Sequence, residues 1–117
     1  MPSPSRQVLN VQTIGDVTVV KFLDRMIMDE PTIRLIGEHL MRLVNDEGRR
    51  HIALHFDNVE YLASLIVAKL VAVKKKLDAA GGKLTFCHVD EQVYKIFEIS
   101  RLDKYFDVPR PAGGGED

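Results

Sequence analysis

The feature that most constrains the fold is an apolar run, His51–Phe56, followed closely by an amphipathic helical pattern over Ser64–Ala80. A continuous apolar run such as HIALHF is typical of a strand that helices cover. In the following segment, apolar residues recur at helical spacing and form one stripe, with Val67 and Val71 beside it. The stripe consists of Ile66, Leu70, Val73, Leu77 and Ala80. A buried strand followed by a helix that packs on it predicts an α/β fold.

The segments before this unit predict a hairpin and a second helix. Val8–Thr13 and Val17–Phe22 are rich in β-branched residues and flank the turn pair Gly15-Asp16. Asp29 is a suitable N-cap, and Pro31 lies in the first turn, where its missing N–H costs nothing. The apolar face of this helix consists of Ile33, Ile36, Leu40, Leu43 and Val44.

The segments after it predict one more strand and one more helix. Gly81-Gly82 is a helix C-terminal signal, and Lys83–His88 reads as the next strand. Asp90 is the expected N-cap of a helix that ends near Ser100, and Tyr105–Val108 is expected to add a short edge strand. The core face of this last helix consists of Val93, Ile96, Phe97 and Ser100. The element order predicts a mixed sheet of four to five strands with three helices, which leaves one sheet face partly open.

Composition narrows the class of protein. The chain has 117 residues, is 45% hydrophobic and 28% charged, and carries a net charge of −1. This length and composition predict one domain over residues 7–108, with flexible tails at 1–6 and 109–117. No run approaches the roughly 18–20 apolar residues of a membrane span. A single cysteine, Cys87, fits a reducing compartment, so we expect a soluble cytoplasmic protein. The three lysines at 74–76 interact favourably with the negative end of a helix dipole, and no aromatic residues are interleaved with them to stack on bases. Nucleic acid is therefore not an expected partner.

No pattern indicates an enzyme, a metal or a cofactor. Gly81-Gly82 ends a helix and does not open one, so it is not a phosphate loop. His51 and His55 fall on one face of a strand but about 13 Å apart, because a strand rises about 3.3 Å per residue. Cys87 and His88 are neighbours on the predicted strand and are expected to point to opposite faces. A small enzyme that uses Cys87 or a histidine therefore has no support from spacing.

Three spaced motifs resemble one known family over residues 8–108. They follow the predicted strand in order: Val59-Glu60-Tyr61-Leu62, Gly81-Gly82-Lys83-Leu84, and the closing segment Phe97–Phe106. These residues resemble the anti-sigma-factor antagonists, which are built on a STAS domain. The resemblance implies a protein-binding module in bacterial transcription or stress signalling whose partner is a kinase-type anti-sigma factor or a related regulator. It further implies that a serine or threonine in an Asp-Ser-Ser/Thr-Gly tetrad controls binding when phosphorylated.

The tetrad positions of this chain depart from the family pattern. They read Ala63-Ser64-Leu65-Ile66, so a leucine replaces the acceptor hydroxyl, and His55 replaces the acid at the strand end. Ser64 alone keeps its type. A serine at a helix N-terminus acts first as a cap, and phosphate there would be stabilised by the N–H groups, which makes Ser64 a candidate phosphorylation site. We expect the phosphorylation switch to be lost or altered.

The resemblance and the exposed apolar residues together predict a partner-binding surface. The Met-rich loop offers adaptable apolar contacts, and the start of the second helix offers an outward-facing leucine. The predicted surface comprises Met26, Met28, Asp29, Asn58, Glu60, Ala63, Ser64, Leu65 and Ile66. An alternative is a STAS scaffold that self-assembles, or an accessory subunit of a larger signalling or lipid-transport complex, for which Leu65 would also serve as a contact.

Overall fold

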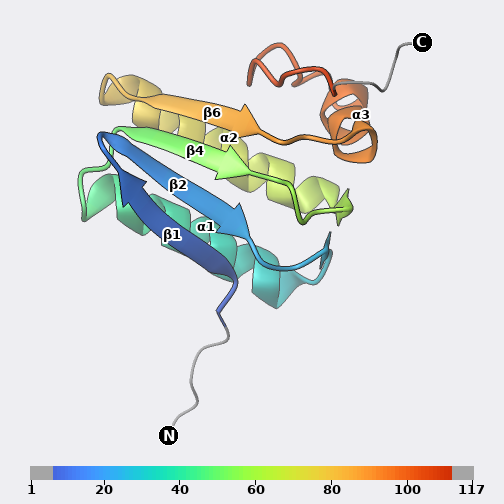
Figure 1. Ribbon diagram of the computed structural model, residues 1–117, viewed down its shortest axis with the longest axis horizontal. Helices are drawn as coiled ribbons and strands as arrows, with labels where there is room; N and C mark the ends of the chain where they lie inside the picture. The colour runs from blue at the N-terminus through green and yellow to red at the C-terminus, as the bar shows by residue number, and fades with distance from the viewer. Residues whose placement is uncertain (1–6, 112–117) are drawn as a thin grey trace, which may run out of the picture.

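A four-stranded sheet organises the computed structural model, which describes residues 7–111 (Figure 1). The strands run in the order β1-β2-β4-β6, and their bounds are Leu9–Ile14, Val17–Phe22, His51–His55 and Lys83–Cys87. Figure 1 shows α1 and α2 behind this sheet, with α3 beyond the end of β6. The helices span Glu30–Asn45, Ser64–Ala79 and Glu91–Ile99, respectively. The α/β prediction with three helices is confirmed.

Pairing in the sheet is antiparallel once and parallel twice. β1 and β2 form the predicted hairpin around Gly15, whose φ of 62° is readily adopted by glycine. β2 pairs in parallel with β4, and β4 with β6. The register aligns Val20, Leu54 and Phe86 across the three strands. All three are buried, so alternate residues of these strands form the side of the core that the sheet contributes.

The core lies between this sheet face and the two helices behind it. The predicted stripe of α2 is buried from Ile66 to Leu77. Ala80 is exposed and lies outside the helix, because α2 ends at Ala79 and Gly81 takes a left-handed φ of 79°. At the α3 end, contacts between aromatic rings close the core. The rings belong to Phe22, Phe56, Phe86, Phe97 and Phe106.

The predicted caps are confirmed at two helix starts. The Asp29 carboxylate accepts hydrogen bonds from the Thr32 N–H (3.1 Å) and the Thr32 hydroxyl (2.8 Å). The Asp90 carboxylate accepts from the Val93 N–H at 2.9 Å. Each bond satisfies a backbone donor that the first turn of a helix leaves unpaired.

Two expectations for the C-terminal region are wrong. Ser100 is exposed rather than in the core, because α3 ends at Ile99 and the Ser100 hydroxyl donates to the Ile96 carbonyl (2.6 Å). Tyr105–Val108 forms turns rather than a strand, because the Val108 N–H donates to the nearby Asp103 carbonyl (2.8 Å). Most of both predicted tails, 1–6 and 112–117, lies outside the described residues. Between residues 7 and 111, no helix is both long and apolar enough to cross a bilayer.

Candidate protein-binding site

A second, two-stranded sheet joins two loops at one end of the main sheet. β3 (Met26–Ile27) pairs in parallel with β5 (Tyr61–Leu62). The pairing is extended by the Glu60 N–H, which donates to the Arg25 carbonyl at 2.8 Å. The side chains of Arg25 and Glu60 also form an ion pair, with 3.0 Å between Nε and Oε2. The loop after β2 and the loop after β4 therefore form one continuous surface, which the sequence did not predict as a sheet.

Large apolar side chains are exposed on this surface. Ile27 and Leu62 point into the core and are fully buried, so alternation along each short strand turns its neighbour outward. The start of α2 adds a further apolar side chain. The outward-facing residues are Met26 (51% exposed), Met28 (53%), Tyr61 (43%) and Leu65 (45%), and we call these four the β3–β5 surface. Adaptable methionines beside an aromatic ring are typical of surfaces that bind proteins.

The β3–β5 surface continues into a shallow hollow against α3. The hollow has a volume of about 500 Å³ and is lined by Met26, Glu60, Tyr61, Gln92, Lys95 and Ile96. The α3 residues are missing from the surface predicted from sequence, because nothing in their local pattern places them beside β5. Helical spacing of Gln92, Lys95 and Ile96 on one face of α3 is the signal that could have grouped them.

The start of α2 differs from the prediction in two respects. The N-cap is Ala63, which makes no side-chain capping bond, while Ser64 is the first helical residue and is exposed. Ser64 therefore is not the cap. The Ala63 N–H donates to the Ile27 carbonyl at 2.8 Å, which fixes the helix start against β3. Ile66 is fully buried and packs in the core, so a partner cannot contact it directly, contrary to its place in the predicted surface.

The polar residues of the predicted surface are exposed, but they also hold the loops in place. Asp29 caps α1, as described above. The Asn58 side chain donates to the Leu23 carbonyl at 2.8 Å and so links the two loops. Glu60 is paired with Arg25. Substitution of any of these three polar residues would change the shape of the surface, and substitution of Asp29 or Glu60 would also change its charge.

The histidine and cysteine positions form no recognisable catalytic group. His88 follows the end of β6 and takes a φ of 57°, which brings its ring to 5.0 Å from the ring of His55. Burial, then His88 and Lys21, lower the pKa of His55, while Asp57 acts in the opposite direction. Burial raises the pKa of the Cys87 thiol and so disfavours the reactive thiolate. Among residues 7–111, no three His, Cys, Asp or Glu side chains are grouped to hold a metal ion.

Comparison with known proteins agrees with this architecture. The STAS domain family model matches residues 9–111. A protein of Bordetella bronchiseptica, named "Putative anti-sigma factor antagonist BtrV", is 30% identical over 63 residues. That match covers 54% of this chain, and it spans only about half (54%) of the relative's length.

Solved structures share the fold at low identity. SpoIIAA, an anti-sigma factor antagonist in its unphosphorylated form, superposes with a TM-score of 0.75 at 14% identity, covering 90% of this chain and 89% of SpoIIAA. An anti-sigma factor antagonist from Mycobacterium paratuberculosis gives a TM-score of 0.70 at 19% identity, covering 91% of this chain and 86% of that one. With the family model matched over almost the whole described chain, the protein belongs to the STAS domain family.

Proposed function

We propose that this protein is a binding module of the anti-sigma-factor-antagonist type that docks a regulatory protein through the β3–β5 surface without a phosphorylation switch. The expected partner is a kinase-type anti-sigma factor or a related regulator in bacterial transcription or stress signalling. The proposal assigns the protein no enzymatic step and no cofactor.

The observation that carries the proposal is the exposed position of Leu65 at the second residue of α2. In the family pattern this position holds the acceptor hydroxyl, and here it holds an apolar side chain next to exposed methionines. Leucine has no oxygen to accept phosphate. The tetrad carboxylate is also gone, because Ala63 occupies its position. Such a surface favours constant apolar docking over charge-controlled release.

Ser64 remains the one hydroxyl of the tetrad positions where phosphate could be added. It is exposed at the first position of α2, where N–H groups and the helix dipole favour an anion. A phosphate there would place about −1.5 to −2 charges beside Leu65. Phosphopeptide mapping after incubation with the recovered partner and Mg-ATP decides this point: we expect no phosphate on Ser64 in the wild type, and stoichiometric phosphate there would contradict the proposal.

The main experiment compares wild type with Leu65→Asp in affinity capture from the native cell extract, with partners identified by mass spectrometry. The introduced aspartate is compatible with the fold, because an acid in the first turn interacts favourably with the helix dipole and α2 has none there. We expect a kinase-type or sigma-related regulator with wild type and its loss with Leu65→Asp. Recovery of the same regulator by both proteins would show that the β3–β5 surface is not the docking site.

A matched control places the same charge elsewhere. Ile99, on α3, is 78% exposed and lies outside the β3–β5 surface, so Ile99→Asp is expected to leave capture unchanged. Ile99 is also the observation that favours the second candidate, a scaffold or accessory subunit of a signalling or lipid-transport complex. Loss of a partner with Ile99→Asp but not with Leu65→Asp would favour that candidate.

A gain-of-function variant tests the reason for the lost switch. The double variant Ala63→Asp/Leu65→Ser restores a carboxylate and an acceptor hydroxyl at exposed or half-buried positions and leaves the buried Ile66 in place. We expect the recovered kinase-type partner to phosphorylate the new serine and to release the phosphorylated protein. Continued binding after full phosphorylation would contradict the inference that the missing acceptor hydroxyl is what makes docking constant in the wild type.

A further inference from the structure

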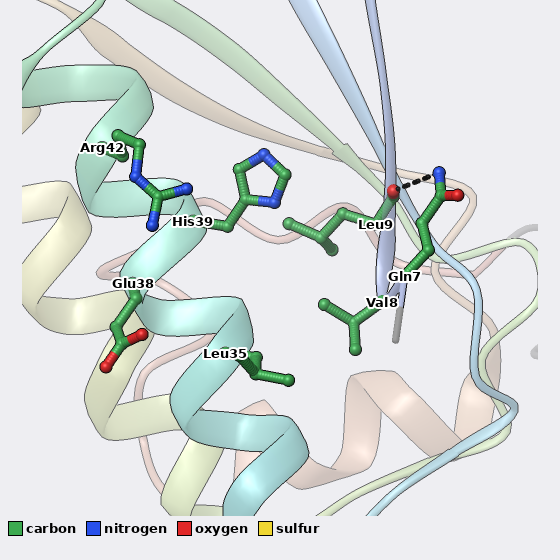
Figure 2. Close-up of a pocket in the computed structure, with 7 residues that line it drawn as sticks. All are labelled: Gln7, Val8, Leu9, Leu35, Glu38, His39 and Arg42. Atoms are coloured by element: carbon green, nitrogen blue, oxygen red, sulfur yellow. Dashed lines mark hydrogen bonds between the residues drawn. The ribbon is translucent and has the colours of Figure 1, made fainter. Parts of the chain in front are cut away.

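A groove runs along the outer side of β1, between that strand and α1 (Figure 2). Its volume is about 440 Å³, and its lining consists of Gln7, Val8 and Leu9 on one side and Leu35, Glu38, His39 and Arg42 on the other. Figure 2 shows Leu35 and His39 pointing from α1 toward Val8 and Leu9, while Glu38 points away. Leu35 and His39 therefore face Val8 and Leu9 across the groove, which lies directly beside the edge strand of the sheet.

The backbone of β1 carries N–H and C=O groups that do not bond to β2 and that lie on the strand's outer side. The Leu23 N–H donates to the Val8 carbonyl at 3.1 Å, which makes these two residues a hydrogen-bonded antiparallel pair. Because such pairs alternate along the strand, Asn10, Gln12 and Ile14 bond to β2. The N–H and C=O groups of the intervening residues, Leu9, Val11 and Thr13, then point away from the sheet.

One contact agrees with this assignment. The Gln7 side-chain amide donates to the Leu9 carbonyl at 3.1 Å, and the dashed line in Figure 2 marks this bond at the outer edge. Within residues 7–111, no other strand lies beside β1 on that side.

β1 also lacks the features that normally protect an edge strand. Residues 7–15, QVLNVQTIG, contain no charged residue and no proline, and the one-to-one register with β2 contains no bulge. The opposite edge strand, β6, begins with Lys83 and packs Phe86 against Phe106 of the C-terminal turns. β1 therefore lacks the charged residue that the opposite edge strand carries.

We propose that β1 pairs with β1 of a second copy of this chain, antiparallel and about a two-fold axis at Val11. In this register the outward-facing groups of Val11 bond to Val11 of the other copy, and those of Leu9 bond to Thr13, whose N–H replaces the Gln7 side-chain amide at the Leu9 carbonyl. On the open face Asn10 lies opposite Gln12, a pair of side-chain amides that can bond to each other.

Three observations favour a second copy over another partner. The two-fold register uses all three outward-facing residues at once. The strand is uncharged, so two copies bring no like charges together in the pairing. In this register the helix-facing Thr13 of the second copy lies opposite Leu9, at the groove that Leu35 lines, and Leu35 is partly exposed without it. Because one strand and one groove make a small interface, we expect a dissociation constant in the micromolar range.

Two measurements test the dimer directly. Sedimentation velocity from about 5 to about 500 µM is expected to show a monomer that converts to a dimer as concentration rises. Amide hydrogen exchange followed by NMR gives a residue-level readout: the amides of Leu9, Val11 and Thr13 exchange fast in dilute protein and slow down at high concentration. Those of Asn10, Gln12 and Ile14 are protected throughout, because β2 holds them.

The decisive variant is Thr13→Lys, which places a lysine on an exposed side chain of the edge, as protected edge strands do. It is expected to abolish the concentration-dependent dimer and to leave far-UV circular dichroism unchanged. Ala72→Lys, an exposed change of equal charge on α2, is the control and retains the dimer. A wild type that stays monomeric at about 500 µM, or a dimer that Thr13→Lys leaves intact, overturns the proposal.

Discussion

Replacing Gly82 by alanine perturbs the point where the end of α2 meets the start of β6. The Gly82 N–H donates to the Leu77 carbonyl at 2.7 Å and closes the helix C-terminus. The next residue, Lys83, donates its N–H to the Arg50 carbonyl at 2.7 Å and begins the pairing of β6 with β4. A Cβ at Gly82 would overlap the same Arg50 carbonyl oxygen and would lie 3.0 Å from Leu77 Cδ2.

The expected loss of stability follows from which atom is displaced. Backbone cannot rotate aside as a flexible side chain can, so the Arg50 carbonyl must shift and its hydrogen bond to Lys83 must lengthen. Overpacking of this kind costs about 1–3 kcal/mol, and a weakened hydrogen bond adds about 1 kcal/mol, so we expect Gly82→Ala to cost about 2–4 kcal/mol. With a urea m-value of about 2 kcal/mol/M, the unfolding midpoint falls by about 1–2 M.

The neighbouring glycine gives the control. Gly81 has a φ of 79° and no atom close to where a Cβ would lie, so Gly81→Ala costs only the left-handed backbone penalty, about 1 kcal/mol. The assay is urea unfolding followed by far-UV circular dichroism, with both variants measured beside wild type. A Gly82→Ala midpoint equal to or higher than that of Gly81→Ala would refute the reasoning from the Arg50 overlap.

Two further predictions concern the cap of α1 and the histidine pair. Asp29→Ala is expected to destabilise the fold by about 1–2 kcal/mol in urea unfolding, because it removes the acceptor for the N–H and hydroxyl of the buried Thr32. Asp29→Asn is the control, because the asparagine side chain keeps most of the cap. Equal losses of stability in the two variants would contradict a capping role. Burial, then His88 and Lys21, lower the pKa of His55 from 6.5, while Asp57 opposes this change. The histidine therefore binds a proton more readily in the unfolded chain than in the folded protein. The neutral form of His55 contributes stability above pH 6.5, and this stability is lost as pH falls. The urea midpoint of wild type is therefore expected to drop more between about pH 7.5 and about pH 5.5 than that of His55→Gln, and equal drops in the two proteins would argue against a lowered pKa.

The helix ends are the part of the fold that could be predicted from short stretches of sequence. Asp29 and Asp90 act on N–H groups three residues away, and Gly81 takes a backbone conformation that few other residues adopt. These interactions depend on neighbours in the chain, so a local pattern predicts them well. Ser64 is the exception, because a serine near a helix start predicts a cap there, whereas the N-cap is Ala63.

The candidate site could be predicted only in part, for a reason of distance along the chain. The apolar character of Met26, Met28 and Leu65 at outward positions predicts them as contacts, and the structure places them on one exposed surface. The hollow beside them has no counterpart in the sequence prediction, because its α3 side comes from residues more than thirty positions away from Tyr61. The tetrad position of Ile66 suggests the surface, although its own helical stripe indicates the burial that is observed.

By itself, then, the sequence determined the order of the four strands of the main sheet and the three helices, the caps at Asp29 and Asp90, and the buried stripe of α2, because hydrophobic periodicity and capping act within a few residues. The tertiary structure alone decided which distant segments meet. It paired Met26–Ile27 with Tyr61–Leu62, brought the rings of His55 and His88 to 5.0 Å, and left β1 at an uncovered edge beside α1. Each of these depends on the registration of the whole sheet, in which a strand's neighbours are set by long-range hydrogen bonding and by burial of one shared face.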